Sequence, residues 1–471
     1  MKMGIGEIVV MLKDIAWGPW MLVLLLGTGV YLSCRVGFIQ FRKFGYAMKN
    51  TIGKMFKKTS AGEGEVTPFQ AVATALAATV GTGNIAGVTG AICVGGPGAV
   101  FWMWVSALFG MVTKYSEVVL AVRYRERNAQ GDWVGGPMYY IRNGLGKGWN
   151  WLACVFCLLG ALAAFGIGNM TQVNTIATSI NTAIDSFGGS TAAYTVTLFG
   201  QRVPVSSIMV GAIVAMIVGM VLFGGIKRIG AVAELLVPVM AVIYIVAALI
   251  VVAFNLDSLG SVFAMIFKGA FSAEAALGGA FGITIMTTIQ KGVGRGVFSN
   301  EAGLGSAPMA HATSSEKDPV KQGLYGIFEV FMDTIVICTL TSLTLLCGAG
   351  DKIVWGKGAG AELISASFSS VFGAQVGSML VAVGITLFAL STILSWSLYG
   401  TRCCEFLLGG KAARAYQVIF VCIILVGATL KLDLVWDIAE MLNGFMAVPN
   451  LVALLGLSPV VIKLTKEHFA K

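Results

Sequence analysis

The residues that could do chemistry in this sequence are small polar residues inside long apolar runs. Asn84 directly follows Gly81 and Gly83 in a run rich in Ala and Val. Three glycines at the centre of a helix, with Gly87 the third, favour unwinding there, because each costs a helix about 1 kcal/mol relative to alanine. Peptide groups freed in hydrocarbon are tolerated only where they line a cavity or bind a ligand. The pattern therefore predicts coordination of a cation and a zwitterion, the alternative being a close-packing face of small residues.

A second polar pair lies near the other end of the chain. Ser391 and Thr392 are adjacent in a run that continues to Ser395 and Trp396. Two neighbouring hydroxyls and freed carbonyls make an oxygen-only site of the kind that a small hard cation prefers. The alternative is that the hydroxyls bond to their own helix backbone.

Most catalytic chemistry is excluded by the residues that are scarce. The sequence has two histidines, His311 and His468, so a His metal site or a Ser-His-Asp relay has almost nothing to be built from. The nine cysteines lie in or beside apolar runs and are interpreted as free thiols. We expect neither an enzyme nor a bound cofactor.

The composition is that of a bilayer protein: 57% of the 471 residues are hydrophobic and 12% are charged, and 61 are glycine. A helix needs roughly 20 apolar residues to cross the hydrocarbon core. Eleven runs of about that length predict an all-α integral membrane protein with eleven transmembrane helices. They span about 17–34, 68–95, 98–122, 151–183, 205–224, 231–254, 271–290, 323–347, 375–400, 415–430 and 441–463.

The basic residues predict the orientation. The net charge is +9, and Lys and Arg concentrate in the loops after odd-numbered helices, as expected of cytoplasmic loops. This bias predicts an N-terminus outside and a C-terminus in the cytoplasm, and no partnership with nucleic acid. Lys291, Arg295 and Lys317 are assigned to the cytoplasmic side, and Lys13 and Lys352 to the outer side.

Helices 2 to 11 divide into two sets of five. Because five is odd, successive halves enter the membrane from opposite faces, which gives a 5+5 inverted repeat. The predicted parts are an extra N-terminal helix with a basic segment, 1–67, a first repeat, 68–254, and a second repeat with the C-terminal tail, 255–471. In the second half, Gly278, Gly279 and Gly282 are the expected counterpart of the first break.

Two acidic residues lie within the eighth predicted helix. Glu329 and Asp333 are four residues apart and project from one face. A buried carboxylate there serves either a proton relay or hydrogen bonds that fix a neighbouring broken helix. Lys114 and Glu117 lie near the cytoplasmic end of the third predicted helix, where we expect an interfacial pair or side chains that reach the membrane surface.

Several motifs resemble the alanine or glycine:cation symporter family, which includes the sodium:alanine symporters and is related to the leucine-transporter-type fold. The resemblance covers nearly the whole chain. Its most specific stretches are 81–88, 95–104, 165–170 and 296–308. It implies that the last ten helices form the core.

The resemblance also implies a site. Substrate contacts are implied for Thr79, Thr82, Gly83, Asn84, Gln172, Phe281, Gly282, Ile283, Thr284 and Trp396. The carboxylate would face the backbone N–H groups of Thr82 and Gly83, with Gln172 donating to it. Ile283 and Trp396 would leave room for little more than a methyl group. A sodium ion would lie among Ala77, Val80, Phe388, Ser391 and Thr392.

Together these features predict sodium-coupled symport of alanine or glycine by alternating access in the plasma membrane of a prokaryotic cell, with no obligatory protein partner. Proton coupling through Asp333 or Glu329 is the first alternative. An ion channel is the second, disfavoured because no segment has a filter repeat or rings of charge.

Overall fold

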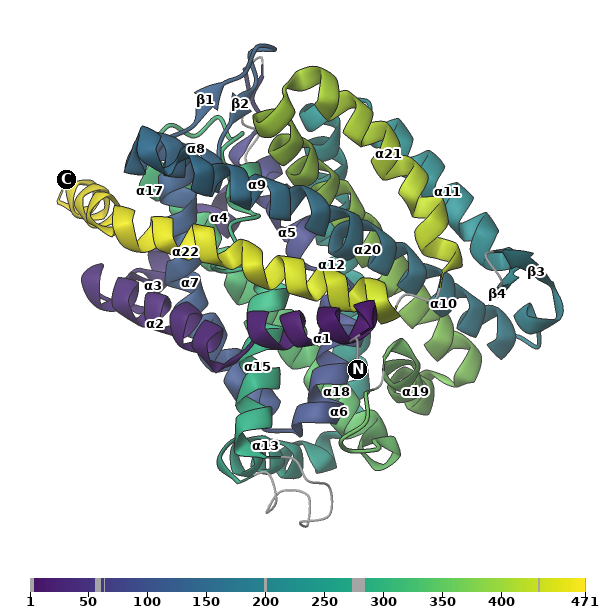
Figure 1. Cartoon of the computed structure of the whole chain (residues 1–471). Helices are drawn as coiled ribbons and strands as arrows, with labels where there is room; N and C mark the ends of the chain where they lie inside the picture. The colour runs from purple at the N-terminus through teal and green to yellow at the C-terminus, as the bar shows by residue number, and fades with distance from the viewer. Residues whose placement is uncertain are drawn as a thin grey trace.

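The computed structural model describes residues 4–55, 61–62, 64–198, 201–272, 284–358, 360–430 and 433–470. Nearly all of this chain is helical (Figure 1). The helices of its first half are α1 (Ile5–Ala16), α2 (Pro19–Arg35), α3 (Ile39–Arg42), α4 (Phe44–Met55), α5 (Pro68–Thr79), η1 (Gly83–Gly87), α6 (Val88–Gly95), α7 (Ala99–Arg123), α8 (Pro137–Tyr140), η2 (Ile141–Leu145), η3 (Lys147–Trp149), α9 (Asn150–Phe165), η4 (Gly166–Met170), α10 (Thr171–Ser186), η5 (Thr191–Ala193), α11 (Val205–Leu222) and α12 (Gly225–Ala253).

The second half is also helical, whereas the described strands lie in the first half and form two short antiparallel pairs. Its helices are α13 (Leu256–Phe271), α15 (Ile285–Asn300), α16 (Pro308–His311), α17 (Pro319–Val330), η6 (Phe331–Cys338), α18 (Thr339–Ala349), η7 (Gly350–Lys352), α19 (Ala361–Phe372), α20 (Ala374–Leu408), α21 (Gly410–Thr429) and α22 (Asp433–Phe469). The hairpins pair β1 (Glu126–Arg127) with β2 (Trp133–Val134) and β3 (Thr195–Leu198) with β4 (Gln201–Pro204).

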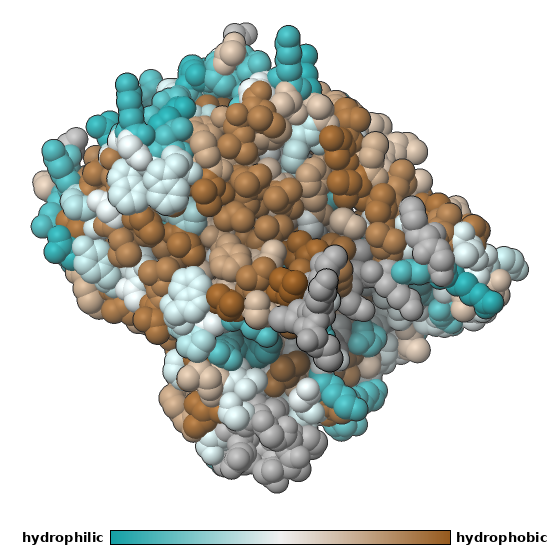
Figure 2. All heavy atoms as spheres, in the orientation of Figure 1, coloured by the Kyte–Doolittle hydropathy of each residue, from teal (hydrophilic) through white to brown (hydrophobic). Residues whose placement is uncertain are grey.

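Within the described residues, nine helices are long and apolar enough to cross a membrane, or ten when the bent pair Pro68–Thr79 and Gly83–Gly95 counts as one span. Hydrophobic residues form a broad surface across the middle of the face in Figure 2, and hydrophilic residues gather at its upper edge. This surface fits a multi-pass membrane protein, because side chains facing lipid tails need no polar partners.

The predicted span 271–290 is wrong as a continuous helix. Helix α13 ends at Phe271, and α15 begins at Ile285 with Thr284 as its N-cap, the Thr284 side chain accepting a hydrogen bond from the Thr287 N–H. A Thr cap satisfies an otherwise unpaired N–H and favours a helix start. Phe281, Gly282 and Ile283, like Gly278 and Gly279, lie outside the described residues. The polar residues of α15 explain the error, since they remove it from a search for apolar runs.

The core is built around two long helices, α7 and α20. Helix α7 packs against α15 and α17, while α20 packs against α5, α9, α10 and α19. On the right of Figure 1, α11 and α21 lie side by side. These contacts bring the polar residues of η1, η4, η6 and α20 into the interior.

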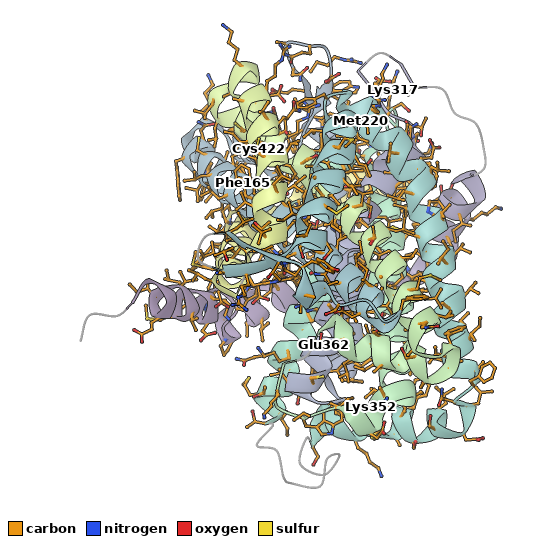
Figure 3. All side chains as sticks on the ribbon, turned by 90° about the vertical axis from the view of Figure 1, so that its right-hand side faces the viewer. Phe165, Met220, Lys317, Lys352, Glu362 and Cys422 are labelled. Atoms are coloured by element: carbon orange, nitrogen blue, oxygen red, sulfur yellow. The ribbon has the colours of Figure 1, made fainter. Side chains whose placement is uncertain are left out.

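The two ends of the molecule carry different charged residues. Lys317 lies near one end in Figure 3 and Lys352 near the other, as the charge bias predicts. Lys291 and Arg295, however, line the same cavity as Lys13. Assigning them to opposite sides of the membrane was therefore wrong, and the cause is again the misplaced span 271–290.

A clasp at the Lys317 end joins three segments. The guanidinium groups of Arg125 and Arg127 both lie over the Trp133 ring, with their Cζ atoms 4.4 and 4.6 Å from its centroid. Its indole N–H donates to Glu65 at 2.8 Å. Arg125 donates to the Ala312 carbonyl at 3.1 Å. Trp133 of β2 and Arg125, which precedes β1, thus contact both the segment before α5 and the segment after α16.

Candidate functional site

The first interruption lies where the sequence predicts it. Helix α5 starts at a capping box, in which the Thr67 hydroxyl accepts from the Gln70 N–H, and it ends at Thr79. After the break the chain continues as η1 and α6, bent by 48° from α5. A side chain on Gly81 would place its Cβ 2.4 Å from the Thr392 hydroxyl oxygen, so the close approach of α20 requires glycine there.

Two amide side chains hold the broken ends. The Gly81 N–H donates to the Asn84 side-chain oxygen at 2.9 Å. The Thr82 N–H and hydroxyl both donate to Gln172 Oε1, at 3.3 and 3.0 Å. Asn84 is fully buried and Gln172 is 4% exposed. These contacts replace the helix hydrogen bonds that the break removes.

Neutral oxygens gather where the end of α5 meets α20. The Ser391 hydroxyl donates to the carbonyls of Ala77 at 3.2 Å and Phe388 at 2.8 Å. The Thr392 hydroxyl donates to the same two carbonyls, both at 3.0 Å. Four of the five predicted sodium ligands therefore lie together, and Val80 is buried directly after the end of α5. An oxygen-only set suits a hard monovalent ion, whose charge the carbonyl dipoles balance.

A second interruption occurs at residues 301–307, which sequence reasoning missed as a break. Helix α15 ends at Asn300, and Glu301, Gly303 and Gly305 have φ values of 55°, 92° and 83°. Left-handed backbone suits glycine but strains a glutamate. The signal was present in the family motif 296–308, which contains both glycines.

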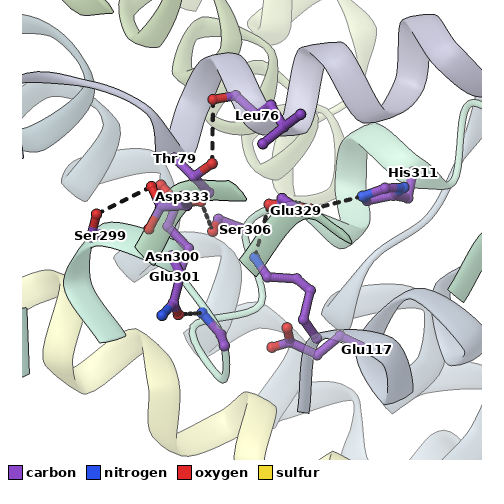
Figure 4. Close-up of polar contacts among 12 residues, drawn as sticks. Leu76, Thr79, Glu117, Ser299, Asn300, Glu301, Ser306, His311, Glu329 and Asp333 are labelled. Atoms are coloured by element: carbon purple, nitrogen blue, oxygen red, sulfur yellow. Dashed lines mark hydrogen bonds and ion pairs between the residues drawn. The ribbon is translucent and has the colours of Figure 1, made fainter. Parts of the chain in front are cut away.

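Carboxylates hold the second interruption. Glu117 of α7 accepts from the Gly303 and Gly305 N–H groups, both at 3.1 Å. Glu301 accepts from the Trp396 indole at 2.9 Å and from the Ser306 hydroxyl. Figure 4 shows Glu117, Glu301 and Ser306 around this segment. The second break is thus tied to α7 and α20.

Asp333 of η6 connects the two breaks. It accepts from the Asn84 amide at 2.7 Å, from Ser299 at 3.2 Å and from Thr334 at 2.7 Å. The Asn300 amide donates to Thr334 at 3.0 Å. Three donors on one buried carboxylate match the predicted role of fixing a neighbouring broken helix. Two of the four π-helical segments in the described residues, η1 and η6, supply Asn84 and Asp333 to this network, and such segments are frequent at functional sites.

Glu329 has different partners, although it lies one turn before Asp333. Lys114 Nζ lies 3.3 Å from one of its oxygens, and His311 lies 3.0 Å from the other. His311 in turn contacts the Gln322 amide at 2.9 Å. Lys114 and Glu117 are fully buried, so their expected place at the membrane interface was wrong. Sequence spacing cannot reveal a charge partner supplied by another helix.

The remaining predicted residues lie in different places. Trp396 is buried against η4, where a Cβ on Gly168 would lie 2.1 Å from the tryptophan Cβ. Thr79 is buried, and its hydroxyl donates to the Leu76 carbonyl at 3.3 Å. Thr284 is exposed at the start of α15, and the structure does not bring it to the first break.

A bundle of apolar helices in which the span formed by α5, η1 and α6 is broken, with neutral oxygens gathered at that break, defines a membrane transporter of the broken-helix class. A model of the sodium:alanine symporter family matches residues 2–471. The chain belongs to this family, whose members are transporters and not enzymes.

The sequence aligns with those of curated relatives over nearly their whole length. The chain is 45% identical to the sodium/alanine symporter AgcS of Methanococcus maripaludis, over 96% of this chain and 95% of that protein. It is 36% identical to the probable sodium/glutamine symporter GlnT of Bacillus subtilis, over 99% and 91%. A crystal structure of MhsT in complex with L-phenylalanine superposes with a TM-score of 0.59 and 13% identity, covering 86% of this chain and 99% of that one. This likeness shows the leucine-transporter-type fold.

Proposed function

We propose that the protein is a sodium-coupled symporter that carries alanine or glycine into the cell by alternating access. The observation that carries this proposal is the convergence of the Ser391 and Thr392 hydroxyls with the Ala77 and Phe388 carbonyls at the first break. Sodium bound there would order the broken helix and complete the adjoining substrate site. The name of AgcS, a sodium/alanine symporter, supports the choice of ion and substrate.

The substrate carboxylate binds at the start of the half-helix formed by η1 and α6, where freed N–H groups and the helix dipole favour an anion. Gln172 Oε1 already accepts from the Thr82 N–H, as a carboxylate oxygen would. When substrate binds, the Gln172 side-chain amide rotates and releases the Thr82 N–H. The Gln172 amide N–H and the backbone N–H groups of Thr82 and Gly83 then donate to the substrate carboxylate. Carbonyls near Thr79 receive the ammonium group.

The substrate side chain faces Trp396. Glu301 fixes the indole by a hydrogen bond, and Gly168 lies against its Cβ, so the ring has little freedom to move aside. This rigidity supports a small side chain such as a methyl group. The second break contributes to this wall through Glu301, which bonds to Trp396, while Phe281, Gly282 and Ile283 remain predicted contacts.

The two halves 68–254 and 255–471 act as the inverted repeats, each containing one broken helix, and 1–67 is an addition. The chain lies in the plasma membrane of a prokaryotic cell with the Lys317 end in the cytoplasm, since basic residues collect there. The N-terminus is then outside.

Coupling is thermodynamically sufficient. An inward-negative potential of about 100 mV contributes roughly 2.3 kcal/mol per sodium ion, and a tenfold sodium gradient adds about 1.4 kcal/mol. One sodium ion can therefore concentrate a neutral amino acid several hundredfold, by the rule that about 1.4 kcal/mol is a factor of ten.

Uptake of labelled alanine into proteoliposomes tests the proposal. We expect accumulation with an inward sodium gradient and none when choline or potassium replaces sodium. Equal uptake in all three salts would contradict sodium coupling. An inward proton gradient without sodium tests the alternative through Asp333 or Glu329, and accumulation under that condition would favour it.

A further inference from the structure

A large cavity opens beside the first break, on the side away from the Lys317 end. It has a volume of about 880 Å³ and lies among α1, η1, α6, α15 and α22. Its charged lining residues are three basic and three acidic ones: Lys13, Lys291, Arg295, Asp14, Glu362 and Glu440. Charges of both signs in equal number suit a zwitterion better than an ion of either sign.

Arg295 occupies an unusual position in this cavity. Its side chain is 14% exposed, and its Cζ lies over the Phe298 ring at 4.6 Å from the centroid. Its Nη2 is 4.0 Å from Glu440 Oε1, which is longer than a hydrogen bond. Its Nη1 is buried and has no hydrogen-bond partner among the described residues. A buried guanidinium with an unmatched donor is prepared to accept an anionic ligand.

The guanidinium also lies directly on the first break. A Cβ added to Gly87 would be 2.3 Å from Nη1, and one added to Gly83 would be 3.6 Å from it. Gly87 must therefore be glycine for the arginine to rest there. Gly83 is the residue whose N–H is assigned to the substrate carboxylate in the proposed function. Arg295 thus lies between the open cavity and the carboxylate position.

We propose that Arg295 binds the α-carboxylate of the entering amino acid, releasing its loose contact with Glu440 as it does so. This inference rests on the proposed function and deepens it, because it names the group of the substrate that is read on entry. The planar guanidinium presents two parallel donors that match a carboxylate. Glu440, freed of Arg295, remains in the same cavity to attract the ammonium group. The protein therefore selects compounds with a free α-carboxylate and rejects their amides.

An analogue cycle tests this contact. Purified protein in sodium is titrated with labelled L-alanine, and unlabelled L-alaninamide is used as the competitor. We expect the preference of the wild type for alanine over alaninamide to fall by about tenfold to a hundredfold in Arg295→Gln, the range for one hydrogen bond to a charged group. Lys291→Gln is the matched control, since it removes one positive charge from the same helix and the same cavity. It should keep the wild-type preference.

Arg295→Lys keeps the charge and loses the paired donors, so its preference should lie between those of the wild type and Arg295→Gln. It also provides the test if the glutamine variant does not fold. An unchanged preference in both arginine variants, or an equal loss in Lys291→Gln, would overturn the inference while alanine binding by the wild type upholds the proposed function. Failure of the wild type to bind alanine in sodium would overturn the proposed function and this inference with it.

Discussion

The two breaks differ in what holds them. Amide groups of Asn84 and Gln172 contact the backbone of the first break, the Asn84 amide donates in turn to Asp333, and the predicted cation ligands nearby are neutral oxygens. Carboxylates of Glu117 and Glu301 hold the second break. Amides can exchange partners at small cost, whereas removing a buried carboxylate strands several donors. From this comparison we expect the first break to change on ligand binding and the second to stay fixed.

The largest effect is expected from Glu117→Ala. This change leaves the N–H groups of Gly303 and Gly305 without their acceptor, and the Asn450 amide keeps only the Gly303 carbonyl. Unfolding should become easier by about 3–5 kcal/mol, the cost of stranding buried partners of a charge. Thermal unfolding in detergent measures it. Glu117→Gln keeps one acceptor oxygen and should recover most of the stability, and a wild-type melting temperature for Glu117→Ala would contradict the assigned role.

The next largest effects are expected from glycine substitutions, which should lower uptake at the first break and stability at the second. In Gly81→Ala the added Cβ meets the Thr392 hydroxyl at 2.4 Å, so alanine uptake should fall by about a hundredfold, as for a displacement of about 1 Å at a binding site. In Gly303→Ala the strained φ should instead lower stability by about 1–2 kcal/mol.

Gly53→Ala is the control for both glycine variants, because no atom lies within 4 Å of the added Cβ. Uptake assays and melting curves on the same three preparations distinguish a functional from a structural loss. If Gly81→Ala transports normally, the first break is not the site of action.

A smaller effect is expected at the proposed cation ligands. Ser391→Ala combined with Thr392→Ala removes two of the oxygens and should raise the sodium concentration for half-maximal alanine binding by about tenfold. Alanine binding at saturating sodium should change less. Thr386→Ala is the matched control on α20, because its hydroxyl donates to the Ala382 carbonyl of its own helix. An equal sodium requirement in both variants would remove the assignment.

The smallest effect is expected from Asp333→Asn. The amide keeps an oxygen for the Asn84 donor, and the Thr334 hydroxyl can rotate to accept from the new amide. Sodium-driven uptake should stay within about threefold of the wild type, which is less than 1 kcal/mol. Abolished uptake with an intact melting curve would point instead to a proton relay.

The first break could be predicted because Gly81, Gly83 and Asn84 interrupt an otherwise apolar run. The second could not be found in the same way, since Gln290, Lys291 and Arg295 make α15 too polar for a search of apolar runs. Its residues were nonetheless conspicuous in the motif 296–308. The sequence motif carried the signal that hydropathy lacked.

The burial of the Lys114 and Glu329 charges could not be predicted from the sequence either. Lys114 and Glu329 are far apart in the sequence and lie on different helices, and their pairing appears only when α7 packs on α17. A lysine near a helix end commonly reaches water, so the interfacial interpretation was the natural one. Three-dimensional packing decides such cases.

The clasp around Trp133 has a mechanical consequence. Glu65 precedes α5 and Ala312 follows the second interruption, so Trp133 and Arg125 link the two interrupted segments at the Lys317 end. A movement of either segment at this end must therefore break these contacts or carry the other segment with it.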